Sequence, residues 1–335
     1  MKRVSKLLSI VLIIAVIAAM TAGCGSSSTG EIKAPASVST GSEKTESKPN
    51  EPAETPDNAS SEESNNEPAE NIDNAVEETA DIAETSTEVS IEESVIFDQD
   101  GIKITAKSLD MTGFFGPEIK LLIENGSEKS VTVQSRNTSV NGYMIEPMLS
   151  ADVAAGKKAN DTLTLTQSDL DAAGITTIAD IELSFHIFDS ESWDTIIDSD
   201  PIRIETSAAD GFEYLYDDSG DLVYNENGVE IVVKGLSEDG SWLGPSIVVY
   251  IKNTGDKNVT VQARDVSIND FMVEAVFSCD ILSGKHAVDM ISFMSSDLEA
   301  NDINSIESVE LSFHVYDMDT WDTIVDTSPV TINFD

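Results

Sequence analysis

The chain has 335 residues and a formal net charge of −43 at pH 7, from 62 Asp and Glu residues against 19 Lys and Arg. An acidic surface of this size repels nucleic-acid phosphates and anionic lipid headgroups, which excludes a DNA- or RNA-binding role. It favours solubility, cationic partners and divalent cations.

The N-terminus has the pattern of a signal peptide. A short basic start precedes an almost continuously apolar stretch over residues 7–20, which is too short to span a bilayer but suits a signal-peptide core. Small residues then lead to Cys24, which resembles the bacterial lipobox, although Thr21 stands where leucine is usual. We expect a signal peptide over residues 1–23 and a lipid anchor at Cys24 on the extracellular face of the cell membrane. The alternative is an ordinary secretory signal with an incidental cysteine.

Residues 24–95 have the composition of a spacer. The segment 25–95 contains no aromatic residue and carries a net charge of −15. Such a stretch cannot bury enough apolar surface to offset its ordering entropy, so we expect 24–95 to be a disordered acidic linker. A coil of about 70 residues spans roughly 45–50 Å on average and would lift the folded part clear of the membrane. The alternative is an acidic tail with no length requirement.

A duplication follows the linker. Residues 116–205 align without a gap on 244–333, and 40 of the 90 aligned pairs are identical. The period of 127–128 residues is far longer than that of a solenoid, so each copy is a whole domain. We expect a first repeat over 96–206, a linker over 207–221 and a second repeat over 222–335.

Each repeat has mostly strand-like patterns. Short apolar runs with partial alternation are separated by turn formers such as Asn125-Gly126. One short helix is expected at 168–174, with Ser168 as its N-cap and Gly174 at its end. The strands predicted in the first repeat are 102–106, 119–123, 130–134, 143–149, 162–166, 181–188 and 195–204. Because no βαβ rhythm occurs, we predict an all-β fold of two tandem β-sandwiches, each with one short helix.

The pattern is similar to that of a family. The run Ile119–Asn125, the segment Val131–Gln134, the Ser-Asp-Leu helix and the late Glu182–Phe188 strand resemble the uncharacterised immunoglobulin-like tandem-repeat surface lipoproteins of clostridial-type Gram-positive bacteria. The resemblance covers both repeats, the lipobox and the linker. It implies an Ig-like sandwich on the cell surface, and it implies no reaction.

An acidic turn occurs in both repeats and is the candidate metal site. Carboxylates at its first, third and sixth positions could gather oxygen ligands around Ca²⁺, although the glycine and terminal glutamate of an EF-hand are missing. The alternative is a solvated turn between two strands. Trp193 and Trp321, inside these turns, either pack the hairpin or stack on a ligand. The six carboxylates are Asp189, Glu191 and Asp194, and Asp317, Asp319 and Asp322.

Other polar residues also recur at equivalent positions. An arginine kept in both copies either bridges carboxylates within the sandwich or marks a recognition patch. The recurring pairs are Gln134 and Gln262, Arg136 and Arg264, Asn141 and Asn269, and His186 and His314. By contrast His286 aligns with Lys158, which predicts a surface position, and Cys279 aligns with Ala151 among apolar residues, which predicts an inert core thiol.

The motifs of catalysis are missing from the sequence. It has no Gly-rich phosphate loop, no nucleophile elbow and no Ser-His-Asp order. We therefore expect no enzyme, and no cofactor apart from calcium as a candidate. The leading hypothesis is a membrane-anchored, non-catalytic surface protein whose twin domains bind a cell-wall polymer or an envelope protein with avidity. The alternatives are a calcium-dependent adhesion or structural module and, third, a cell-envelope hydrolase.

Overall fold

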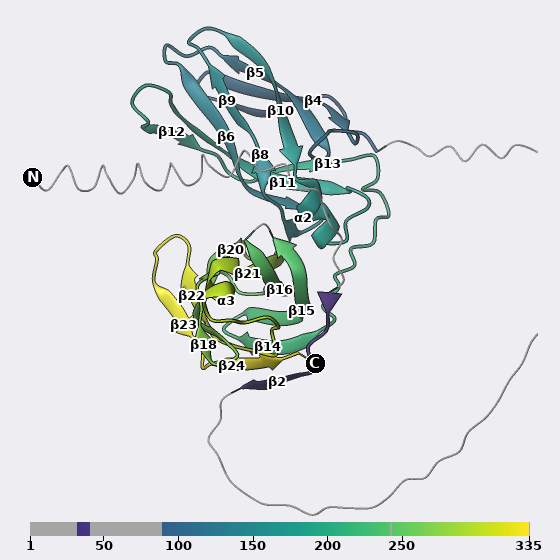
Figure 1. Cartoon of the computed structure of the whole chain (residues 1–335). Helices are drawn as coiled ribbons and strands as arrows, with labels where there is room; N and C mark the ends of the chain where they lie inside the picture. The colour runs from purple at the N-terminus through teal and green to yellow at the C-terminus, as the bar shows by residue number, and fades with distance from the viewer. Residues whose placement is uncertain (1–31, 41–88, 242, 335) are drawn as a thin grey trace, which may run out of the picture. The chain divides into compact units, whose positions relative to one another are not determined.

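The computed structural model describes residues 32–40, 89–241 and 243–334. Within these ranges the chain is predominantly β-strand with two short helices, which confirms the predicted all-β class (Figure 1). Cys24 and most of the predicted linker lie outside the described residues. None of the helices in the described ranges is long and apolar enough to cross a membrane.

The first repeat contributes two layers of antiparallel strands. One layer has the order β3 (Ser94–Gln99), β4 (Ile102–Asp110), β5 (Glu118–Asn125), β10 (Lys158–Leu165) and β8 (Pro147–Met148). The other contains β7 (Tyr143–Met144), β6 (Val131–Val140), β9 (Ser150–Val153), β11 (Asp180–Asp189), β12 (Thr195–Asp198) and β13 (Ile202–Glu205). The helix α2 (Gln167–Ala172) connects β10 to β11.

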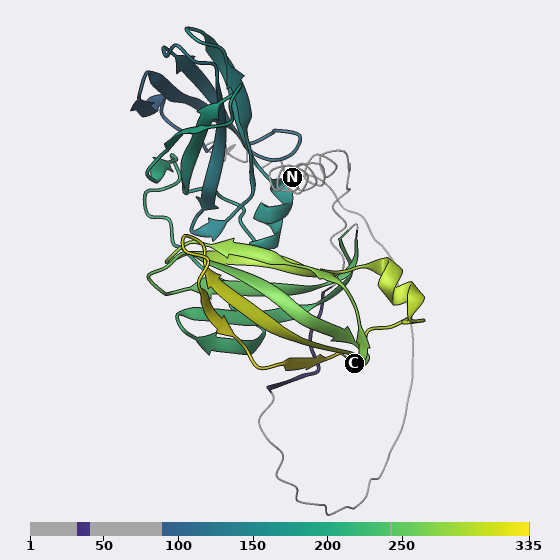
Figure 2. The same cartoon turned by 90° about the vertical axis from the view of Figure 1, so that its left-hand side faces the viewer.

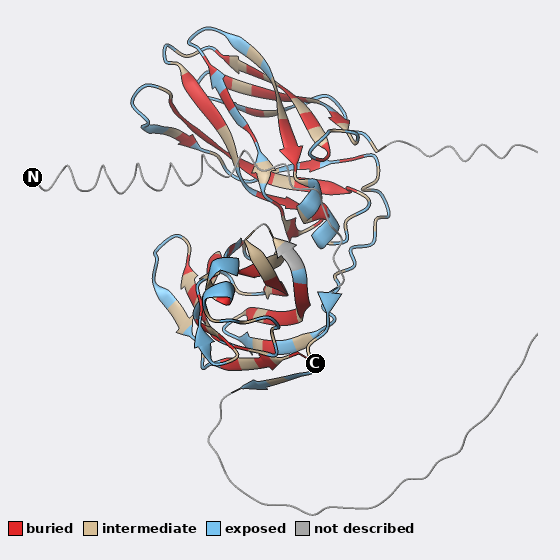
Figure 3. Cartoon of the chain, viewed as in Figure 1, coloured by how far each residue is buried: buried red, intermediate tan, exposed pale blue. Residues whose placement is uncertain are grey.

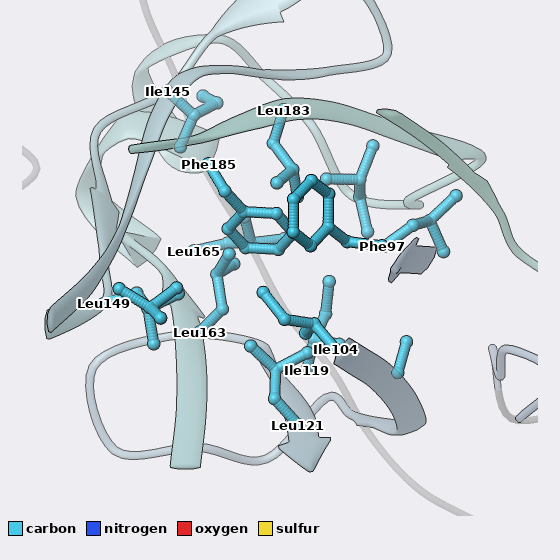
Figure 4. Close-up of a cluster of buried hydrophobic side chains, with 14 of the residues drawn as sticks. Phe97, Ile104, Ile119, Leu121, Ile145, Leu149, Leu163, Leu165, Leu183 and Phe185 are labelled. Carbon is cyan, nitrogen blue, oxygen red and sulfur yellow. The ribbon is translucent and has the colours of Figure 1, made fainter. Parts of the chain in front are cut away.

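The core of the first repeat lies between these layers. In β5 every second side chain is buried, as expected for a strand with one face on the core. Phe97 of β3 and Phe185 of β11 meet edge to face with ring centroids 6.0 Å apart, so the aromatic contact joins the two layers (Figure 4). Figure 3 shows buried residues along the strands of both layers, and β11 is buried almost throughout its length.

The second repeat has the same strand order, and parallel pairing of His286 with Tyr143 joins one layer of each repeat into a single 12-stranded sheet. One layer contains β14 (Asp221–Glu226), β15 (Val229–Ser241), β16 (Gly244–Asn253), β21 (His286–Phe293) and β19 (Ala275–Val276). The other contains β18 (Phe271–Met272), β17 (Val259–Ile268), β20 (Ser278–Ile281), β22 (Ser308–Asp317), β23 (Thr323–Asp326) and β24 (Val330–Asn333). The helix α3 (Ser295–Ala300) lies beyond the ends of these strands (Figure 2). Two apolar clusters result, one centred on each repeat, and Val232 and Tyr250 of the second repeat are buried in the cluster of the first.

The linker prediction is wrong for the part of residues 24–95 that forms strands. β1 (Ile32–Lys33) pairs with β15, β2 (Ser37–Thr40) pairs with β24, and β3 begins at Ser94. The segment has few apolar residues, but Val38 packs against the core of the second repeat. Its backbone gains partners at existing sheet edges, which composition alone does not reveal.

The helix forms where it was predicted, but its N-cap is a different residue. α2 begins at Gln167, so Ser168 lies inside the helix, and Thr166 is the N-cap without a side-chain capping bond. The Thr166 hydroxyl instead donates to the Glu146 carbonyl at 2.6 Å. At the other end Gly174 has φ of +67°, as expected for a residue that follows a helix.

Candidate binding faces

The predicted polar residues gather on the outer face of one sheet in each repeat. In β11 Leu183, Phe185 and Ile187 are buried in the core, so the alternating Ser184 and His186 belong to the opposite face. On the neighbouring strands Gln134 stands opposite His186, Arg136 opposite Ser184 and Asp198 opposite His186. In the second repeat Gln262, Arg264 and Asp326 stand in the equivalent register beside His314 and Ser312.

At one end of each face, three aromatic rings lie in contact in a row. In the first repeat the centroids of His186 and Phe188 lie 5.4 Å apart, and Trp193 stacks on Phe188 at 5.4 Å with an interplanar angle of 18°. In the second repeat Tyr316 takes the place of Phe188, and Trp321 stacks on it at 5.5 Å and 16°. Trp193 is 72% exposed and Trp321 is 74% exposed. Each indole therefore has one supported face and one face open to solvent.

The turn holds the tryptophan in an unusual backbone conformation. Trp193 has φ of +64° and Trp321 has φ of +63°, a left-handed region that bulky side chains rarely occupy. The Trp193 amide donates to the Asp189 carbonyl at 2.8 Å, while the Asp189 carboxylate accepts the amides of Glu191 and Ser192. A shift of register between Ile187 and Phe188 precedes the turn. Backbone strain at a fixed, exposed side chain is typical of recognition sites.

The predicted calcium ligands do not form a metal site in the described part of the chain. The Asp189 carboxylate pairs with Lys129 at 2.9 Å, and this contact with the two backbone amides lowers its pKa to about 2. Asp317 pairs with Lys257 at 2.7 Å, which also lowers the pKa of Asp317. Within 32–40, 89–241 and 243–334, no group of three or more His, Cys, Asp and Glu side chains could hold a metal ion. A cation at either turn would have to displace a lysine ammonium group.

The two arginines do not bridge carboxylates. Arg136 and Arg264 are both exposed, and neither lies within salt-bridge distance of a carboxylate among the residues that the structure describes. The guanidinium of Arg264 donates instead to the Gln262 side-chain oxygen at 3.2 Å. Within the described ranges no ion pair supports the internal-bridge interpretation of these arginines.

The histidines on the outer faces pair with aspartates. His186 Nδ1 lies 2.5 Å from the Asp198 carboxylate, and His314 Nδ1 lies 2.6 Å from Asp326. In the described ranges no hydroxyl or thiol hydrogen-bonds to the other ring nitrogen of either histidine. The geometry orients the imidazoles across the face of each sheet without assembling a nucleophile beside them.

Two further sequence predictions have opposite outcomes. Cys279 is buried and not in a disulfide, as predicted for a core thiol, and burial raises its pKa. The surface prediction for His286 is wrong, because this residue is only 7% exposed. Its ring stacks on Tyr216 with centroids 3.7 Å apart, and its Nδ1 lies 2.6 Å from the Tyr250 hydroxyl. The aligned Lys158 gave no indication of this contact.

Some residues of these faces were not identified from the sequence. Phe188 and Tyr316, which support the tryptophans, lie in strands whose alternation places them on the polar side. That alternation was a usable indication, because it places Phe188 on the same side of the strand as His186. Thr132 and Thr260 also face this side, and each donates to an aspartate on the adjacent strand at 2.5 Å.

The comparisons with known proteins add little. No protein-family model and no curated protein matches the chain. Among solved structures, the YadV chaperone is 12% identical with a TM-score of 0.20, over 63% of this chain and 91% of that one. A protein of unknown function from Porphyromonas gingivalis W83 is 13% identical with a TM-score of 0.17, over 63% of this chain and 89% of its own. At such TM-scores neither similarity carries an argument about this chain.

Proposed function

We propose that this protein is a lipid-anchored, non-catalytic binding protein of the cell surface. In this proposal its two Ig-like β-sandwich domains present the same face to a repeating glycan of the cell wall. The observation that supports it most is the pair of exposed tryptophans, Trp193 and Trp321, held at left-handed φ beside equivalent polar sheet faces.

The exposed side chains of Arg136 and Arg264 contribute little to the stability of the fold. Exposed residues away from caps, turns and buried networks contribute little to stability, so packing does not require that Arg136 and Arg264 be identical. The bulky tryptophans are even unfavourable in their backbone conformation. A binding requirement shared by both repeats explains why the same side chains stand on both faces.

The chemistry of the face fits a sugar polymer. The open side of each indole offers a flat apolar surface for the C–H face of a pyranose ring, and aromatic rings of this kind are well suited to such amphipathic partners. The amide of Gln134 and the guanidinium of Arg136 offer hydrogen bonds to hydroxyl groups. The net charge of −43 repels anionic polymers, so we infer a neutral or cationic glycan.

Two equivalent faces on one chain suit a repeating ligand. When one face binds, the second meets the same polymer at a high effective concentration, so overall affinity exceeds that of either face. An anchor at Cys24 would keep the protein beside the wall. The cores hold without disulfides, so this cysteine has no structural role to fill among the described residues.

Binding of the mature chain to purified wall glycan tests this proposal. We expect Trp193→Ala and Trp321→Ala each to weaken binding about 10-fold, which is about 1.4 kcal/mol. The double variant should weaken it about 100-fold or more because avidity is also lost. Phe114→Ala is the matched control, since Phe114 is an 83% exposed aromatic residue outside both faces.

Three other results would count against parts of the proposal. Equal binding by the wild type and the double variant would exclude the tryptophan faces. Capture of an envelope protein with no glycan binding would identify a different partner. A higher unfolding midpoint in millimolar calcium than in chelator would favour the calcium-dependent alternative.

A further inference from the structure

Residues 32–40 connect the two layers of the second repeat. β1 pairs with β15 of one layer through Ile32 opposite Ser237 and Lys33 opposite Leu236. Three residues later β2 pairs with β24 of the other layer, from Ser37 opposite Asn333 to Thr40 opposite Val330 (Figure 1). A segment far from the second repeat in sequence therefore adds a strand to each of its sheets.

Side-chain and backbone contacts fix the register of this segment. The Ala36 amide donates to the Asn333 carbonyl at 2.7 Å, and the Asn333 side-chain amide donates to the Ser37 hydroxyl at 3.0 Å. Val38 packs against the core of the second repeat, next to buried residues of β24 such as Ile332. The segment thus combines strand pairing with one apolar contact, which is the usual pattern of a peptide added to a sheet edge.

The corresponding edge of the first repeat is covered differently. There the Ser207 amide, just after β13, donates to the Ser90 carbonyl at 2.7 Å, and Val89 and Ile91 pack against the core. In the second repeat the chain that precedes β14 takes another course, because Tyr216 stacks on His286. Among the described residues, it is the segment 32–40 that pairs with the edge of β24.

One sequence difference between the repeats marks the docking site. Gly235 in β15 occupies the position of Ser108 in the first repeat, and within the described ranges the only strand that pairs with β4 at Ser108 is β5. Gly235 has φ of +153°, and a Cβ atom there would lie 2.4 Å from the Lys33 carbonyl oxygen and 2.6 Å from Ile32 Cγ2. Only glycine admits the strand so close to the backbone.

From these contacts we infer that residues 32–40 are a strand clamp that fastens the N-terminal end of the mature chain to the second repeat. This inference rests on the proposed anchor at Cys24. With the clamp closed, the spacer between lipid and second repeat is residues 24–31, about eight residues that reach at most about 29 Å. Residues 41–88 then connect the clamp to the first repeat and do not add to the spacer. With the clamp open, the lipid would instead be joined to the first repeat through residues 24–88, and a coil of about 65 residues has a mean span of roughly 40–48 Å.

Hydrogen exchange of the mature, non-lipidated chain tests the clamp. We expect the amides of residues 36–40 to exchange at least 10-fold more slowly than those of 41–88. Val38→Asp should abolish that protection, because a carboxylate replaces the apolar contact, and Gly235→Val should do the same from the acceptor side. Ser108→Val is the matched control at the equivalent position of the first repeat and should leave residues 36–40 protected.

Two outcomes would overturn the clamp. One is free-chain exchange of residues 36–40 in the wild type, and the other is unchanged protection in Val38→Asp. Gly235→Val has a β-branched side chain at an unfavourable φ, so its unfolding curve must be compared with that of the wild type. Val38→Asp changes only the docked segment and decides the matter if Gly235→Val fails to fold.

The distance between the second repeat and the bilayer provides a second test. Lipidated protein in neutral phospholipid vesicles would carry a donor fluorophore on the second repeat, with acceptors in the bilayer. Energy transfer should be higher for the wild type than for Val38→Asp, and equal transfer would refute the short spacer. If mass spectrometry finds no lipid on Cys24, the proposed anchor and the proposed short spacer are both wrong. Hydrogen exchange then still tests whether residues 32–40 are docked on the second repeat.

Discussion

At the scale of single residues, identity between the repeats has two different physical causes. Asn141 and Asn269 both have φ of +50°, which asparagine tolerates better than most residues. The Asn141 side chain donates to the Thr177 carbonyl at 2.7 Å and accepts the Ala179 amide at 2.8 Å. Arg136 has no such network and is exposed. The asparagine is thus required by the fold, whereas the arginine is free to serve a partner.

This difference predicts the stability of two variants. Asn141→Ala should destabilise the first repeat by about 2–3 kcal/mol, because a buried carbonyl and amide lose their partners and alanine disfavours positive φ. Arg136→Ala should change stability by less than about 0.5 kcal/mol. Chemical denaturation monitored in each repeat measures both. A cost for Arg136→Ala equal to that of Asn141→Ala would show that the arginine is structural.

The sequence alone could not distinguish the asparagine that the fold requires from the exposed arginine. Both residues are polar, both recur at the same offset, and burial alone distinguishes them. The same limit explains His286, since alignment with Lys158 says nothing about the tyrosines that surround it. By contrast the face on which His186 lies was predictable from the alternation between Leu183 and Ile187, although the residue is buried rather than half-exposed.

At the scale of elements, long alternating strands were predictable and short ones were not. The runs at β4, β5 and β11 contain several β-branched or aromatic residues and were identified, whereas β6 was identified only over residues 131–134 of Val131–Val140. β9 has only the four residues Ser-Ala-Asp-Val, and β3 follows an acidic stretch, so neither has a strong pattern. β1 and β2 are shorter still and form because two sheet edges accept them. Tertiary partners rather than intrinsic propensity determine such strands.

The helix ends allow a matched pair of predictions. Gly174 follows α2 with φ of +67°, and Asp302 occupies the equivalent position after α3 with φ of +56°. Asp302→Gly should stabilise the second repeat by about 0.5–1 kcal/mol, because glycine adopts this conformation without steric cost. Gly174→Ala should destabilise the first repeat by about 1 kcal/mol. Thermal unfolding measures both, and shifts in the same direction would contradict the argument.

At the scale of the whole molecule, the two repeats meet around buried titratable groups. The carbonyl of Gly142 accepts the His286 amide at 3.0 Å, and Lys285 pairs with Glu182 at 3.0 Å. A cavity of about 190 Å³ is lined by residues of both repeats. Among them the half-buried Asp169 and Asp289 have raised pKa values, mainly because their carboxylates are desolvated. Their charged forms are disfavoured, so their contribution to stability rises as the pH falls through these raised values.

His286 has the opposite dependence on pH. Burial lowers the pKa of His286 to about 4, from about 6.5 in an exposed histidine, and the positive charges of Lys252 and Lys285 also lower it. Asp218 acts in the other direction. Above pH 6.5 the imidazole is neutral in both the folded and the unfolded chain. Between pH 6.5 and 4 only the unfolded chain binds the proton, so stability is lost as the pH falls, by up to about 1.4 kcal/mol per pH unit and about 3 kcal/mol in total.

The carboxyl groups with raised pKa values oppose this loss of stability. The prediction therefore concerns the difference in free energy of unfolding between the wild type and a variant without the histidine. His286→Gln removes the titration but keeps a side chain that can hydrogen-bond to Tyr250. We expect the free energy of unfolding of the wild type, relative to His286→Gln, to fall steadily between pH 6.5 and 4.5 and to stay constant between pH 7 and 8. His314→Gln is the control on an outer face. Parallel curves for the wild type and His286→Gln would mean that the histidine titrates as freely in the folded chain as in the unfolded one, and the contact between the repeats would then not depend on a neutral imidazole.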